Sequence, residues 1–210
     1  MGAIQGYHLA VTEREHGILG RLGLALVRRR GVLLAPVFAA AFFFTRPFAH
    51  ELALEAACFA LALGAWTLRM WAMGYRNWVR GPGERHLITR GPYALLRHPR
   101  YVANFLAGLA WFALAFDPVL VAVYVVLYWA LLGTVIVREE EKLAQDYPGF
   151  AEWRASVPAL VPAIWRLGEV RTREPGEEWR LSTIKIEPAK LALVLAGLAA
   201  LALKRRGLLP

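Results

Sequence analysis

Long apolar runs alternate along the chain with short segments that are rich in arginine and glutamate. Four apolar runs cover residues 32–44, 52–68, 101–116 and 118–137. A helix needs about 20 apolar residues to cross the hydrocarbon core of a bilayer. Arginine and tryptophan side chains at the ends extend the reach of a shorter run. The pattern therefore predicts an all-α polytopic membrane protein with four to five transmembrane helices.

A fifth apolar run, residues 191–203, is ambiguous. As a helix, its roughly 13 residues cover only about 20 Å. A helix of this length can span a thinned bilayer, lie in the interface or pack on the cytoplasmic part of the protein. We favour a span, although this would place Lys204, Arg205 and Arg206 outside the cell.

The third and fourth runs are joined at Asp117-Pro118, which predicts a helical hairpin. The arm back to His98 has about 19 residues and the arm forward to Glu139 about 22, so both are about 30 Å long. Arms of similar length bring the polar segment 97–101 and the acidic run 139–141 together at one membrane surface. A water-soluble reagent and a lipid-like acceptor both reach such a place, which is typical of an enzyme that acts on an amphiphile.

The composition agrees with a membrane protein. The chain is 58% hydrophobic with a mean hydropathy of +0.40, which excludes an ordinary soluble domain. The net charge of +9 indicates contact with anionic lipid headgroups, and we expect no nucleic acid partner. The single cysteine, Cys58, lies in an apolar run, so we expect neither a disulfide framework nor a metal site. The sequence does not determine the oligomeric state.

The distribution of lysine and arginine predicts the orientation. The segments before the first run, between the second and third, and after the fourth are basic, whereas the turn at Asp117 carries no positive charge. Because cytoplasmic loops retain positive charge, the amino terminus and both polar clusters are predicted to be cytoplasmic. The richness in alanine, leucine and arginine indicates a prokaryotic chain in an inner or plasma membrane.

Two polar clusters are the candidates for chemistry. His98 precedes Pro99 at the start of an apolar run, and an isolated histidine there is ordinarily an interfacial side chain. Three carboxylates, Glu139 to Glu141, follow the fourth run, where the helix dipole favours cations. They either pair with neighbouring basic residues or face inward to hold a cationic ligand. Since adjacent helical residues point about 100° apart, not all three can face the hairpin.

The motif R-H-P-x-Y at residues 97–101, followed across the hairpin by E-E-x-x-L at residues 139–143, resembles the isoprenylcysteine carboxyl methyltransferase and phospholipid methyltransferase superfamily. The run 87–93 and the pair Val157-Pro158 also fit it. Members are integral membrane enzymes that bind S-adenosylmethionine at the cytoplasmic side. The resemblance implies that the cofactor is bound by Leu87, Gly91, Tyr93, Arg97, His98, Pro99, Tyr101, Glu139 and Glu140.

With this resemblance, we expect one domain over residues 1–210. Residues 1–30 form a cytoplasmic or interfacial segment, residues 87–162 the cofactor-binding core, and residues 188–206 a short apolar helix. His98 and Glu139 are the predicted catalytic residues. An inward carboxylate attracts the cationic cofactor, and an amine acceptor needs a base, for which His98 or a glutamate is a candidate.

The acceptor remains open. This chain has Ala103 and then Asn104 where the family usually has glycine at the first position, and its aromatic residues after Leu143 are shifted. A prenylcysteine carboxylate, a phospholipid amine and a small hydrophobic thiol or amine are all compatible. The alternatives are an NADPH-dependent membrane reductase of a sterol-like substrate and a non-catalytic membrane scaffold.

Overall fold

The computed structural model describes residues 30–45, 52–75, 87–171 and 179–209. Within these ranges the chain is helical and has no strand, which confirms the predicted all-α class. The predicted interfacial segment 1–30 lies, apart from Arg30, outside the described residues. The elements are α3 (Arg30–Phe44), α4 (Leu52–Gly74), η1 (Gly91–Ala94), α5 (Pro99–Ala115), α6 (Pro118–Asp146), α7 (Phe150–Ser156), η2 (Ile164–Arg171), η3 (Leu181–Ile184) and α8 (Glu187–Arg205).

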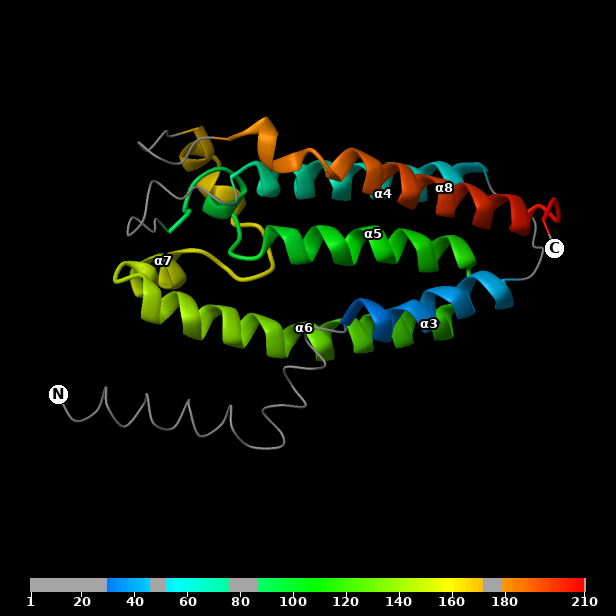
Figure 1. Cartoon of the computed structure of the whole chain (residues 1–210), viewed down its shortest axis with the longest axis horizontal. Helices are drawn as coiled ribbons and strands as arrows, with labels where there is room; N and C mark the ends of the chain where they lie inside the picture. The colour runs from blue at the N-terminus through cyan, green and yellow to red at the C-terminus, as the bar shows by residue number, and fades with distance from the viewer. Residues whose placement is uncertain (1–29, 46–51, 76–86, 172–178, 210) are drawn as a thin grey trace.

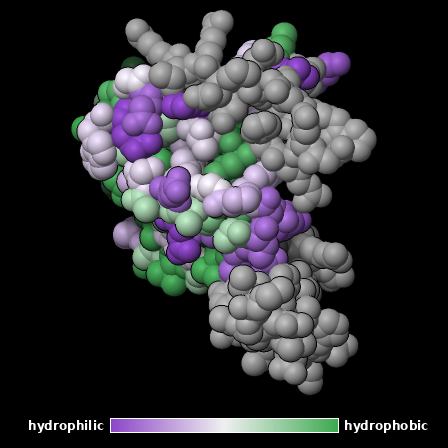
Figure 2. All heavy atoms as spheres, turned by 90° about the vertical axis from the view of Figure 1, so that its left-hand side faces the viewer, coloured by the Kyte–Doolittle hydropathy of each residue, from purple (hydrophilic) through white to green (hydrophobic). Residues whose placement is uncertain are grey.

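The long helices lie along one axis, and the short helices gather at one end of the bundle (Figure 1). At this end, called the polar end below, α4 finishes, α5 and α8 begin, and the end of α6 meets α7. Figure 2 looks onto the polar end and shows hydrophilic side chains spread across it. The connection after Pro162 contains the 3-10 helix η2, which contacts η1.

The predicted break between the third and fourth apolar runs is confirmed. Helix α5 ends at Ala115, and Phe116 adopts a left-handed conformation with φ 56°. Asp117 then caps α6, because its carboxylate accepts from the backbone N–H groups of Val119 and Leu120 at 2.9 and 3.1 Å. The cap and Pro118 at the first helical position reverse the chain sharply.

In the part of the chain that the structure describes, two helices, α4 and α6, are long and apolar enough to cross a membrane. Helix α6 has 29 residues and continues past the apolar run through the acidic residues to Asp146, so the three glutamates lie on one helix. Helices α3, α5 and α8 have 15, 17 and 19 residues. The number of four to five transmembrane helices stays a prediction.

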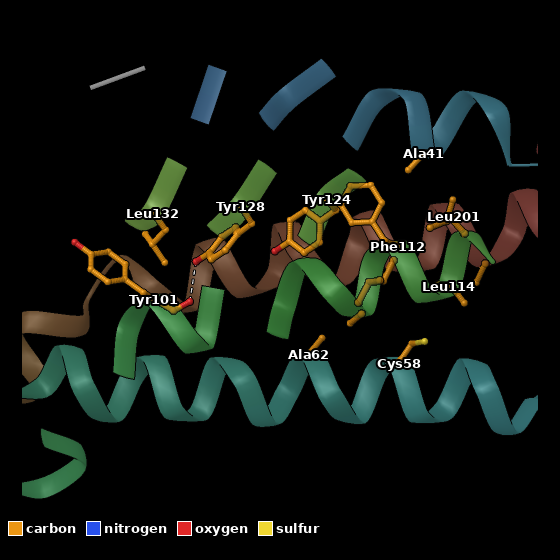
Figure 3. Close-up of a cluster of buried hydrophobic side chains, with 14 of the residues drawn as sticks. Ala41, Cys58, Ala62, Tyr101, Phe112, Leu114, Tyr124, Tyr128, Leu132 and Leu201 are labelled. Atoms are coloured by element: carbon orange, nitrogen blue, oxygen red, sulfur yellow. Dashed lines mark hydrogen bonds between the residues drawn. The ribbon is translucent and has the colours of Figure 1, made fainter. Parts of the chain in front are cut away.

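Aromatic side chains pack between α5 and α6 and hold the two helices together. Tyr124 of α6 stacks on Phe112 of α5 with ring centroids 4.5 Å apart, and Tyr128 donates to the carbonyl oxygen of Tyr101 at 2.7 Å. These residues belong to the largest buried cluster (Figure 3). The hydrogen bond between Tyr128 and the Tyr101 backbone sets the register of the two helices at the end where the predicted site lies.

Helix α8 lies beside α4, with its first residue at the polar end and its last at the opposite end (Figure 1). This is the ambiguous fifth run, and it packs along the bundle rather than on the polar end. Arg206, just after α8, pairs with the buried Glu55 near the start of α4. Glu55 thus provides a carboxylate partner for one of the three basic residues that a spanning α8 would place outside the cell.

Candidate active site

Backbone hydrogen bonds hold the R-H-P motif in place. The N–H groups of Arg97 and His98 donate to the carbonyl oxygens of Pro158 and Ala159 at 2.9 and 3.1 Å. In return, the Ala163 N–H donates to the carbonyl of Leu95 at 2.8 Å. Residues far apart in the sequence therefore fix the segment that begins α5. His98 is the N-cap residue and Pro99 the first residue of this helix, as the sequence predicted.

Glu140 is the buried centre of the site. Its carboxylate pairs with Arg97, lies 2.9 Å from His98 Nε2 and lies 3.2 Å from Arg154 Nε. A buried carboxylate is stable only when it is paired and hydrogen-bonded, and three basic groups do so here. The predicted meeting of the two polar clusters at the base of the hairpin is confirmed by these contacts.

Glu139 is placed differently from its neighbour. Its side chain is 33% exposed, accepts a hydrogen bond from the Tyr101 hydroxyl at 2.7 Å and lies 3.4 Å from Arg100 Nη2. His98 Nδ1 is 4.0 Å from the same carboxylate. The His98 ring therefore lies between two carboxylates, with Nε2 toward the buried one and Nδ1 toward the accessible one. Glu139 keeps part of its surface open to a ligand.

A pocket with about 790 Å³ of empty space, part of it open to solvent, lies beside these residues. Its walls come from the segment before α5, from α5, from the end of α6 and from α7. The lining residues are Leu87, Ile88, Tyr93, Arg97, His98, Pro99, Arg100, Tyr101, Glu139, Leu143, Tyr147 and Trp153.

Two predicted site residues do not line the pocket. Glu140 lies behind Arg97 and His98, which it positions. Gly91 is buried with φ 61°, and a Cβ atom there would come within 2.3 Å of the Tyr75 ring. Glycine therefore allows a turn and a close approach at this position. The other seven predicted residues lie on the pocket wall, and cofactor contact stays a prediction for all nine.

Sequence reasoning missed several residues of the site. Arg154 of α7 reaches Glu140, and no motif pointed to it. Trp153 lines the pocket, and its indole N–H has no hydrogen-bond partner among the described residues. Phe150, Trp153 and Val157 form one buried face of α7 and of the residue that follows it. That face packs against the pocket residues Leu87, Tyr93, Leu143 and Tyr147.

Outside the pocket, Glu187 at the start of α8 forms a second buried polar cluster. Its carboxylate binds Arg69 Nε at 2.6 Å and Lys190 Nζ at 2.9 Å, and Arg69 also donates to the Asn104 side chain. Burial alone would raise the pKa of the Glu187 carboxyl, but the hydrogen bonds and charges of Arg69 and Lys190 outweigh burial and lower it. Among the described residues, no group of three or more potential metal ligands was found.

Comparisons with known proteins bear on this arrangement. Two curated relatives each align over 97 residues, which are 46% of this chain. The cobalt-zinc-cadmium resistance protein CzcN of Cupriavidus metallidurans is 35% identical, over 43% of its own length. The nickel-cobalt-cadmium resistance protein NccN of Alcaligenes xylosoxydans xylosoxydans is 30% identical, over 44% of its length. The matched part of the chain thus spans less than half of these relatives, and no solved structure matches the chain.

The family comparison covers α4 and almost the whole hairpin. It includes the R-H-P-x-Y motif at the start of α5 and the E-E-x-x-L motif on α6. The resemblance inferred from these motifs is confirmed, because residues 52–145 match the isoprenylcysteine carboxyl methyltransferase (ICMT) family.

Proposed function

We propose that this protein transfers a methyl group from S-adenosylmethionine to a lipophilic acceptor at a membrane surface. The observation that supports it best is the accessible Glu139 carboxylate, held by Tyr101 in a pocket at the polar end of the bundle. The family match covers the residues that build this pocket from α5 and α6. The apolar helices α4 and α6 support a membrane location.

The chemistry of the pocket fits the proposed cofactor. S-adenosylmethionine carries a sulfonium, an ammonium, a carboxylate and an adenine ring. Glu139 offers a carboxylate for the cationic groups, whereas Arg100 and the unpartnered Trp153 indole N–H are donors for the cofactor carboxylate. Tyr93 and Tyr147 offer aromatic faces for a ring or a cation.

Bound S-adenosylmethionine supplies an electrophilic methyl group, and its sulfur keeps the electron pair of the broken bond when the methyl passes to the acceptor heteroatom. The protein needs little acid or base chemistry for this transfer. Its residues bind and orient the cofactor and the acceptor, and they exclude water. This binding brings the acceptor into line with the reacting carbon. Glu140 contributes indirectly because it holds Arg97 and His98 in place.

An amine acceptor would first have to lose a proton. We assign that role to Glu139 rather than to His98. The Glu139 side chain is 33% exposed and borders the pocket, whereas the His98 side chain is 4% exposed and its Nε2 is already bound to Glu140. A carboxylate or thiolate acceptor requires no base, so the base question depends on the acceptor.

Two rival functions make different demands on the pocket. An NADPH-dependent reductase must bind a polyanion, which the Glu139 carboxylate in the pocket wall disfavours. In a non-catalytic scaffold, the polar clusters have only to pair with each other. This function does not explain why a third of the Glu139 side chain is exposed at the pocket wall. The two relatives named for metal resistance align with this chain over less than half of their own length.

The proposal is tested by a transfer assay with the purified chain in vesicles. The vesicles contain phosphatidylethanolamine and, in parallel, a prenylcysteine analogue or a long-chain thiol or amine. With S-adenosylmethionine labelled in its methyl group, we expect label in the organic extract for one acceptor class and at least a tenfold loss for Glu139→Gln. Folded protein that labels none of these acceptors would contradict the proposal.

A further inference from the structure

Two further cavities follow the active-site pocket along α5. The first shares Tyr101 with the pocket, and the second shares Phe38 and Asn104 with the first. The second contains about 830 Å³ of partly open space between α4, α5 and α8. The three spaces thus lie one after another along α5, from the polar end toward the apolar part of the bundle.

Asn104 is the one carboxamide in the described walls of both cavities, whose other residues are aliphatic or aromatic. The polar atoms of Tyr124, Tyr128 and Trp66 beside it are engaged elsewhere. The Tyr128 hydroxyl donates to the Tyr101 carbonyl, and the Tyr124 hydroxyl donates to the Phe105 carbonyl at 3.0 Å. The Trp66 indole donates to the Glu187 carbonyl at 3.1 Å.

The orientation of the Asn104 amide is fixed by its partner. Arg69 Nη1 donates to Asn104 Oδ1 at 2.6 Å, and because a guanidinium only donates, the oxygen faces Arg69 and the amide nitrogen faces away from it. Arg69 is itself held by two contacts to the fully buried Glu187, at 2.6 and 3.3 Å. This arrangement therefore orients the two Asn104 N–H donors away from Arg69.

No acceptor for these donors is found among the described residues. A donor that stays unpaired beside an apolar space is unfavourable. The Trp111 indole N–H, which borders the second cavity, is a buried donor that also lacks a partner in the described part of the chain. Unpaired N–H donors of Asn104 and of Trp111 beside one apolar space favour a ligand that brings a hydrogen-bond acceptor.

We propose that Asn104 determines the acceptor specificity of this enzyme by donating a hydrogen bond to an oxygen of the lipophilic acceptor; this inference rests on the proposed function. Asn104 follows Tyr101 by three residues, so it lies about 4.5 Å deeper along α5. The acceptor is then an amphiphile with its reacting head near Glu139 and an ether, ester, carbonyl or hydroxyl oxygen a few bonds away. Its hydrocarbon tail occupies the second cavity, beside Trp111.

The test uses two single-chain amines of equal length, one of which has an ether oxygen a few bonds from the nitrogen where the other has a methylene. Both carry bromine near the tail end, so that binding quenches Trp66 and Trp111, which line the second cavity. In detergent-purified protein we expect about tenfold tighter binding of the ether amine. Asn104→Leu should bind the two amines equally.

Thr134→Val is the matched control. Thr134 is exposed on α6, and its hydroxyl donates at 2.8 Å to the Leu131 carbonyl within the same helix. This variant should keep the preference for the ether amine. Asn104→Asp is the second test variant, because its carboxylate still accepts from Arg69 but offers the cavity no N–H. It should also lose the preference, and it replaces Asn104→Leu if that protein does not fold.

Equal binding of the two amines by the wild type, or a preserved preference in both Asn104 variants, would overturn the inference. S-adenosylhomocysteine is titrated into the same samples and should bind the wild type and the Asn104 variants alike. If the wild type does not bind S-adenosylhomocysteine but still prefers the ether amine, the proposed methyl transfer is refuted. The assignment of Asn104 as an oxygen-binding residue then still holds.

Discussion

Neighbouring glutamates on α6 have different environments, although the sequence presents them as one acidic run. Glu140 is buried among Arg97, His98 and Arg154, whereas Glu139 borders the pocket with a third of its side chain exposed. The third, Glu141, is half-buried and does not line the pocket. The helical rotation of about 100° per residue produces this division between a structural carboxylate and a ligand-facing one.

At the residue scale, we predict that Glu139→Gln and His98→Ala each weaken binding of S-adenosylhomocysteine at least tenfold while the protein stays folded. Glu139→Gln removes the negative charge that faces the ligand. His98→Ala removes a ring that stacks on Tyr101, with the two ring centroids 5.7 Å apart. Calorimetric titration measures the affinity, and thermal unfolding in detergent checks the fold.

Glu140→Ala is the contrasting variant. It leaves Arg97 and His98 without their buried carboxylate, so it should lower the unfolding free energy by about 3 kcal/mol as well as weaken binding. Unchanged affinity in both Glu139→Gln and His98→Ala would refute the site assignment.

The α5–α6 hairpin is the element that places the site, and its contact depends on a small residue. A Cβ atom at Gly108 would come within 2.1 Å of the Tyr124 hydroxyl oxygen. Tyr124 is 1% exposed and surrounded by Phe38, Phe105 and Phe112, so it has little room to move. Glycine at position 108 therefore allows α5 to approach α6 closely.

We predict that Gly108→Ala lowers the thermal unfolding midpoint of the protein, because the new methyl group pushes the Tyr124 ring out of its packed position. Gly133→Ala on α6 is the matched control, since nothing lies within 4 Å of a Cβ atom there. It should be neutral or slightly stabilising, because alanine favours a helix by about 1 kcal/mol over glycine. Equal midpoints for the two variants would contradict this account of the hairpin.

Helix α8 is fastened at the polar end by the ion pair of Glu187 with Arg69 and Lys190. The partners lower the pKa of the Glu187 carboxyl below its ordinary value of 4.5. The stability that this group contributes is therefore complete above the ordinary value and is lost as the pH falls through the lower folded-state value.

We predict that Glu187→Gln is less stable than the wild type near neutral pH and that the difference between their unfolding midpoints narrows below the ordinary carboxyl pKa. Thermal unfolding of both proteins over a pH series measures it. If the difference between the two unfolding midpoints stays constant in acid, the Glu187 charge does not stabilise the packing of α8.

At the scale of the whole molecule, we predict that the polar end lies in the cytoplasm and that the end of α8 lies on the other side of the membrane. Ser156→Cys and Leu208→Cys, each combined with Cys58→Ser, mark the two ends, because both positions are exposed. An impermeant maleimide should label position 156 in inside-out vesicles and position 208 in right-side-out vesicles. Labelling of both positions from one side would show that α8 does not span.

Much of the architecture was predictable because it depends on local patterns. Apolar runs, Asp117-Pro118 and His98-Pro99 determine helix ends, and arm lengths bring the two polar clusters together. The contributions of Arg154 and of the cluster around Glu187 were not predictable. They depend on how α7 and α8 pack against the hairpin. In the sequence, single charged residues on those helices cannot be distinguished from ordinary surface residues. The separate environments of Glu139 and Glu140 likewise required the register set by Tyr128.

The central claim is that the pocket at the polar end binds S-adenosylmethionine. The most direct test is calorimetric titration of the detergent-purified protein with S-adenosylhomocysteine, with NADPH as a parallel ligand. We predict micromolar binding of S-adenosylhomocysteine and none of NADPH. Binding of NADPH alone would support a reductase, and binding of neither ligand to folded protein would contradict the methyltransferase account and favour a scaffold.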